Sequence, residues 1–178
     1  MKKSTLLFLL CPLIPSLAHA QASAPALYGV QEVVYHYAQF PNAKDTETCK
    51  MNREDIAASI KKILKGNNIN ALSVTEAKPP MMGIARIELI PEVTTSTKGG
   101  LDCTSFISLT ARTKANVKIP PIETMRHVTI IYWQQTAMIP TDLSVHATTV
   151  LNGISKMAEA FAQQYHIDQP PALPTIQP

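Results

Sequence analysis

The alternation of apolar and polar positions is clearest over residues 83–111. Two alternating runs, both rich in β-branched side chains, flank a segment of threonine, serine and glycine. Alternation with a period of two buries one face of a strand, and the glycines allow the chain to reverse. This pattern predicts a β-hairpin, which we place at the centre of a sheet.

Further strands are predicted on both sides of this hairpin. Residues 71–76 alternate over a short run, and residues 126–133 are apolar enough for a strand covered on both faces. Residues 112–118 are interpreted as a polar connection, and residues 134–140 as chain that leaves the sheet. Residues 28–40 fit a helical stripe, but their aromatic and β-branched content favours a strand, which we predict.

Two segments carry the three- and four-residue spacing of amphipathic helices. Asn52 is a predicted N-cap with Asp55 in capping-box position, and the helix should stop at Gly66. A longer helix should begin within residues 142–144, because its apolar stripe extends over more than five turns. Gly153 lies in that stripe at a cost of about 1 kcal/mol relative to alanine, which a close approach of helix and sheet would explain.

The order of these elements predicts an α+β fold. We expect a largely antiparallel four- to five-stranded sheet with two helices packed on one face. A single domain should span residues 28–168, preceded by a flexible arm over residues 21–27. Residues 169–178 are proline-rich and are expected to form a disordered tail.

Residues 1–20 have the pattern of a signal peptide. Two lysines precede an apolar stretch too short to span a bilayer, and residues 18–20 form an A-x-A cleavage site. We expect cleavage after Ala20, a periplasmic or secreted location, and no stable membrane insertion afterwards. Lipidation at Cys11 is disfavoured because Leu10, before it, is not small.

The charge balance gives no support for a nucleic-acid partner. The chain has 16 Lys and Arg against 13 Asp and Glu. Cleavage removes two lysines and no acidic residue, so the mature net charge is about +1. Binding to nucleic acid would require a clustered basic face, and the sequence shows none.

Two cysteines, Cys49 and Cys103, remain after cleavage. An even number in an oxidising compartment predicts a disulfide, and residues 41–48 are interpreted as a polar loop that leads to Cys49. A disulfide would close the chain between Cys49 and Cys103 into a loop, which would stabilise the fold by about 4 kcal/mol on the chain-entropy model. Two free thiols or a metal pair remain the alternative, although no other soft ligand has a recognisable spacing.

The sequence predicts no catalytic, cofactor-binding or metal-binding residues. No G-x-S-x-G motif is present, and we place Ser105 and Ser108 on the solvent side of a strand. No two histidines have the spacing of metal ligands, and no glycine-rich loop precedes a helix. The four histidines after the signal are interpreted as surface or edge residues: His36, His127, His146 and His166.

An interaction surface is predicted instead, from Met81, Met82, Trp133 and Lys98. Exposed methionine adapts to partners, and tryptophan often anchors them. The alternative is that Met81, Met82 and Trp133 fill the core. Lys98 belongs to the polar segment of residues 93–102, which a secreted inhibitor would present as its reactive edge.

The chain resembles small uncharacterised exported bacterial proteins with one disulfide. The features that carry this resemblance are Cys49 before the first helix, Cys103 at a strand start, the Tyr132-Trp133 pair and the helix over residues 150–165. The resemblance implies no known activity. At fold level the chain is also similar to periplasmic accessory lipoproteins, whose lipidated cysteine it lacks.

Our leading functional hypothesis is a non-enzymatic periplasmic or secreted protein that binds an envelope partner or assists assembly. One alternative is a small inhibitor of a lysozyme or protease, acting through residues 93–102. A further alternative is a cryptic hydrolase, which would need two carboxylates or a histidine pair converging in a deep pocket.

Overall fold

The computed structural model describes residues 25–79, 84–99, 101–118 and 124–169. In this part of the chain, five strands form one mixed sheet in the order β2-β1-β3-β4-β5, and the helices pack on it. The predicted α+β class is confirmed. The elements in chain order are β1 (Glu32–Tyr35), α1 (Ala43–Thr48), α2 (Arg53–Gly66), β2 (Ala71–Ser73), β3 (Arg86–Lys98), β4 (Asp102–Lys118), β5 (Met125–Asp142) and α3 (Leu143–Asp168).

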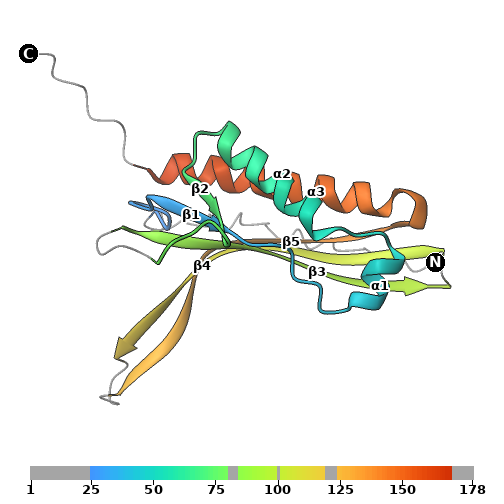
Figure 1. Ribbon diagram of the computed structural model, residues 1–178, viewed down its shortest axis with the longest axis horizontal. Helices are drawn as coiled ribbons and strands as arrows, with labels where there is room; N and C mark the ends of the chain where they lie inside the picture. The colour runs from blue at the N-terminus through green and yellow to red at the C-terminus, as the bar shows by residue number, and fades with distance from the viewer. Residues whose placement is uncertain (1–24, 80–83, 100, 119–123, 170–178) are drawn as a thin grey trace, which may run out of the picture.

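The sheet is mostly antiparallel, as predicted, but it has a parallel corner at β1. Strand β1 pairs in parallel with both β2 and β3, whereas β3, β4 and β5 pair antiparallel. The parallel pairs arise because α1 and α2 carry the chain back between β1 and β2. The long helices α2 and α3 contact each other on one face of the sheet (Figure 1).

Strands β4 and β5 are longer than the sequence predicts. Residues 112–118 are not a connection but the end of β4, and residues 134–140 do not leave the sheet but lie in β5. The two strands pair from Asp102 opposite Asp142 to Lys118 opposite Met125, with an irregularity between Ala111 and Arg112. The polar composition of these residues does not predict a strand, because a two-stranded ribbon exposed to solvent accepts polar side chains and is held by the backbone hydrogen bonds between its strands.

The predicted N-cap of α2 is confirmed. Asn52 precedes α2, and its side chain accepts a hydrogen bond of 2.8 Å from the Glu54 N–H. Helix α3 begins at Leu143, inside the predicted range. Helix α1 was not expected in the predicted loop, because its one alanine and five polar residues form no apolar stripe. The Asn42 side chain, just before α1, donates to Asp45 Oδ2 at 2.7 Å.

The core lies between the sheet and the α2–α3 layer. A Cβ atom built on Gly153 would lie 2.8 Å from Ile139 Cδ1 and 2.9 Å from Ile107 Cδ1, so α3 approaches the sheet closely at this position, as expected. The chain already enters the core at Leu27, whose N–H donates to Asp168 Oδ2 at 3.0 Å. The large side chains buried in this layer include Leu27, Ile56, Ile60, Leu64, Ile87, Leu89, Ile107, Leu109, Ile154 and Phe161.

Candidate functional site

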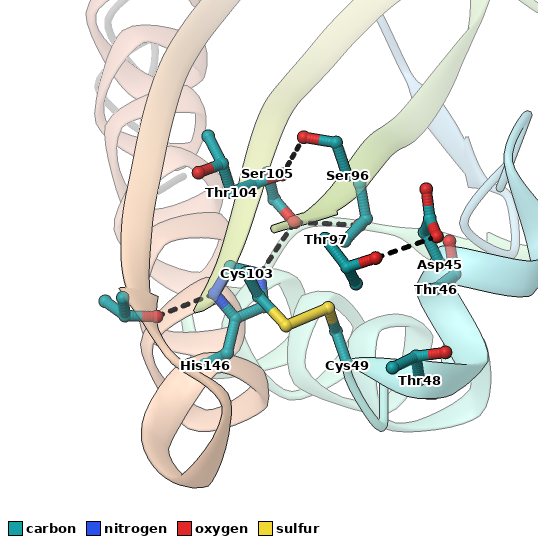
Figure 2. The surroundings of a disulfide bond; sticks show 12 residues. Asp45, Thr46, Thr48, Cys49, Ser96, Thr97, Cys103, Thr104, Ser105 and His146 are labelled. Atoms are coloured by element: carbon teal, nitrogen blue, oxygen red, sulfur yellow. Dashed lines mark hydrogen bonds between the residues drawn. A yellow bond between two sulfur atoms is a disulfide. The ribbon is translucent and has the colours of Figure 1, made fainter. Parts of the chain in front are cut away.

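The predicted disulfide is present and joins Cys49 to Cys103. Their Cα atoms lie 6.2 Å apart, and both side chains are buried. Cys49 follows α1 directly and Cys103 is near the start of β4, so the bond ties the α1–α2 connection to the sheet (Figure 2). A hydrogen bond of 3.1 Å from the Thr97 hydroxyl to Asp45 Oδ1 supports the same junction.

A buried polar network lies beside the disulfide (Figure 2). Ser105 Oγ is 2.8 Å from His146 Nε2 and 2.8 Å from Thr95 Oγ1, while Thr141 Oγ1 is 2.6 Å from His146 Nδ1. Each ring nitrogen therefore has a hydroxyl partner, which satisfies either tautomer of the neutral imidazole. Burial lowers the pKa of His146 below its ordinary value, so the ring is neutral near pH 7.

This network corrects two predictions. Ser105 faces the core rather than solvent, and His146 is fully buried rather than at the surface. Ser108 is also buried, but it lies on the other face of β4 and is not part of the network. Ser105 shares the core-facing side of β4 with Ile107 and Leu109, and its hydrogen bonds offset the cost of burying a hydroxyl. In this structure Ser105 Oγ is closed to solvent, so the Ser105–His146 pair bridges α3 and the sheet rather than facing a substrate.

The face of the sheet opposite α2 and α3 carries an exposed apolar pair. Phe106 on β4 and Met138 on β5 are cross-strand partners, 48% and 70% exposed. Thr94 on β3 is the next residue in the same row. The residues two positions away along these strands point to the same face and include small polar residues: Ser96, Thr104, Ser108 and Thr136. We call this group the Phe106–Met138 patch.

Charged side chains occupy the part of the same face toward β1. Glu32 pairs with Arg86, and His36 Nε2 lies 3.9 Å from Glu88 Oε2. Burial lowers the pKa of His36, the nearby positive charges of Arg112 and Lys114 act in the same direction, and Glu88 opposes them. The Phe106–Met138 patch therefore has a charged border on its β1 side.

The two predicted interaction residues that the structure describes, Trp133 and Lys98, lie at separate places in the sheet. Trp133 is half-buried on β5, with its ring 5.4 Å from that of Phe161 in an edge-to-face contact under α3, the packing expected of a core residue. Lys98 is exposed at the end of β3. Met81 and Met82 lie outside the described residues.

Sequence reasoning missed Phe106 and Met138, although the signal for Phe106 was present. The odd-numbered positions of β4 from Cys103 to Ala111 are buried. Phe106 has an even number, so the alternation places this aromatic side chain on the solvent-facing side of the strand, where polar residues are expected. Met138 could not be found in this way, because residues 134–140 were not expected to be in the sheet.

A cleft of about 710 Å³ lies between the end of the β1 segment and the start of α2. Apolar side chains from both segments line it, among them Tyr37, Phe40 and Met51. Asn52 and Arg53 add polar groups at the helix start. Its size is within the range of small-ligand pockets, so it is a second location at which a partner could bind.

Within the described residues, no helix has the length and apolar character needed to cross a membrane. In the same residues, no three His, Cys, Asp or Glu side chains are placed to hold a metal ion.

No protein-family model and no curated protein matches the chain. Among solved structures, a hypothetical protein from Chlamydia trachomatis is similar with a TM-score of 0.40 and 11% identity, covering 74% of this chain and 98% of that one. A minor lipoprotein from Acinetobacter baumannii has a TM-score of 0.33, 8% identity, and coverage of 78% and 94%. A neuraminyllactose-binding hemagglutinin homologue from Helicobacter pylori has a TM-score of 0.32, 10% identity, and coverage of 78% and 86%. Similarities at this level carry no argument about function.

Proposed function

We propose that this chain is a non-enzymatic binding protein that acts outside the cytoplasm and holds a protein partner on the Phe106–Met138 patch. The exposed cross-strand pair carries the proposal. Aromatic residues supply much of the energy of protein interfaces, and methionine adapts to irregular partner surfaces. Small hydroxyl residues around such anchors let a partner approach the strands closely.

The patch is supported by a rigid platform. Ile107 follows Phe106 in β4 and is fully buried on the opposite face, next to α3. The disulfide at Cys103 fixes the same strand three residues earlier. A surface held in place before binding loses little conformational entropy on association, which favours affinity.

The proposed location has two supports. A buried disulfide is typical of proteins that fold in oxidising compartments, and Cys49–Cys103 is such a bond. The pattern of residues 1–20 predicts export. The partner that we propose is therefore a protein of the periplasm or cell envelope.

Site-specific photocrosslinking in living cells tests the proposal. We expect a photoreactive phenylalanine analogue at Met138 to give a discrete crosslinked species, which Phe106→Ser removes. The matched control is the same analogue at Val145, which is 50% exposed at the start of α3. Equal crosslinking at both positions, or none at Met138, would contradict the proposal, and crosslinking at Phe40 alone would move the site to the cleft.

One observation favours an inhibitor as the second candidate function. Leu101 is 74% exposed in the β3–β4 turn, two residues before Cys103, and its carbonyl accepts a hydrogen bond of 2.8 Å from the Leu143 N–H. An apolar residue on a braced turn suits the reactive edge of an inhibitor. Inhibition of a lysozyme or protease that Leu101→Asp abolishes and Phe106→Ser preserves would favour this function.

A further inference from the structure

The outer part of the β4–β5 ribbon, residues 113–118 and 125–130, forms an arm that projects from the body. It lies beyond the irregularity at Ala111 and Arg112, and its strands pair from Thr113 opposite Ile130 to Lys118 opposite Met125. Figure 1 shows the two strands leaving the body and pointing away from α2 and α3. We call this segment the β-arm.

One face of the β-arm is mainly aliphatic. Cross-strand partners in an antiparallel pair point to the same side, and alternate residues share a side. Thr113, Ala115 and Val117 therefore lie on one face together with their partners Ile130, Val128 and Arg126. Val117 and Ile130 are both more than one-third exposed. This face continues the core-facing side of β4 past the part that the helices cover.

The other face of the β-arm is mainly polar and basic, although it also carries Met125, which is 59% exposed. Lys114, Asn116 and Lys118 share it with Thr129, His127 and Met125. In the described residues of the β-arm there are three Lys and Arg and no Asp or Glu, although acidic residues nearly equal basic ones in the whole chain. Positive charge is therefore concentrated on a segment that also exposes aliphatic side chains.

We propose that the β-arm docks the protein on an anionic phospholipid surface. Its aliphatic face would enter the boundary between headgroups and acyl chains, and Lys114, Lys118 and Arg126 would lie among the anionic headgroups. An isolated two-stranded ribbon is marginally stable in water, so a surface that covers Val117 and Ile130 also stabilises the β-arm. Six residue pairs extend about 20 Å, enough to contact several lipids at once.

Charge complementarity selects a lipid surface over a second copy of the chain. Stacking two β-arms through their aliphatic faces would also cover Val117 and Ile130. It would, however, bring two copies of Arg126, which lies on that same face, close together without an acidic partner among the described residues of the β-arm. Anionic headgroups supply the missing negative charge.

Vesicle flotation tests the proposal with the protein purified after export, so that all variants share one N-terminus. The probes are vesicles of phosphatidylcholine alone and vesicles with one-third phosphatidylglycerol. We expect binding to the anionic vesicles only, weakened by salt. At about 1 kcal/mol per basic residue near an anionic surface, Lys114→Gln/Lys118→Gln should weaken binding on the order of thirtyfold. The control Lys62→Gln/Lys65→Gln removes the same charge from exposed positions of α2 and should bind normally.

A second variant separates the aliphatic contribution from the charge. Val117→Ser/Ile130→Ser keeps every charge and should weaken vesicle binding at least tenfold, with the folded state checked by circular dichroism. Four outcomes would overturn the proposal: no binding to anionic vesicles, equal binding to neutral vesicles, the same loss in the α2 control, or a dimer in sedimentation that this variant dissociates. Crosslinking at Met138 reports on the partner protein separately, so the two proposals can fail independently.

Discussion

Replacing Ser105 with alanine tests whether the buried network is structural. The change removes the hydroxyl that lies 2.8 Å from both His146 Nε2 and Thr95 Oγ1, at a position closed to solvent. An unsatisfied buried polar group costs about 1–3 kcal/mol, so two such groups give an expected loss of about 2–6 kcal/mol in the free energy of unfolding. That is a large share of the stability of a typical domain.

Urea denaturation is a suitable assay, because Trp133 is the only tryptophan and packs against Phe161 in the core. Thr95→Val removes one hydroxyl but leaves Ser105 bonded to His146, so we expect a smaller loss of about 1 kcal/mol. The matched control Ser96→Ala, on the exposed face of β3, should change stability by less than about 0.5 kcal/mol.

The result that would refute this reasoning is a Ser105→Ala variant as stable as Ser96→Ala. That outcome would mean that the hydroxyl contributes nothing to folding. If the same variant also lost a hydrolytic activity of the native protein, Ser105 would have to become accessible to a substrate, and the hydrolase hypothesis would replace the structural one.

Three further predictions follow from the core and the disulfide. Replacing both Cys49 and Cys103 with alanine should lower the free energy of unfolding by about 4 kcal/mol, since the bond spans 54 residues; unchanged urea midpoints would contradict this. Gly153→Ala should lower the free energy of unfolding by about 1 kcal/mol, because the added methyl group overpacks against two isoleucines and this cost outweighs the better helix propensity of alanine. The control Gly66→Ala places its methyl group in open space and should not lower stability in the same urea assay. Stability should be greatest above pH 6.5 and fall as the pH drops below it, because burial lowers the pKa of His146 and its ring therefore takes up a proton more readily in the unfolded chain. Urea midpoints across this range should decline less steeply for His146→Gln.

Features with a local cause could be predicted from the sequence. The Asn52 cap needs only the amide of Glu54 two residues away, and the α3 stripe needs only helical spacing. The disulfide could also be predicted, because the expected compartment and the even cysteine count restricted the pairing to Cys49 and Cys103.

Features that depend on distant partners could not be predicted. Ser105 was placed on the solvent side of its strand, although it shares the odd-numbered positions with Ile107 and Leu109. Its partner His146 is 41 residues away, and the contact becomes visible only when α3 packs on the sheet. Residues 113–118 of the β-arm have the composition of a loop, and they form a strand only because each has a ladder partner in β5. The parallel pairing of β1 similarly depends on where α2 returns the chain.

The hydrogen bonds at Leu27 make the two described ends of the domain neighbours. The Leu27 N–H donates to Asp168, and the Gln169 side chain donates to the Leu27 carbonyl at 2.9 Å, at the same end of the molecule (Figure 1). Because the two ends of the domain lie close together, the domain is suited to circular permutation, in which a short linker joins the ends and new termini are opened elsewhere. For the same reason, the domain could be inserted into a surface loop of a host protein without stretching either chain.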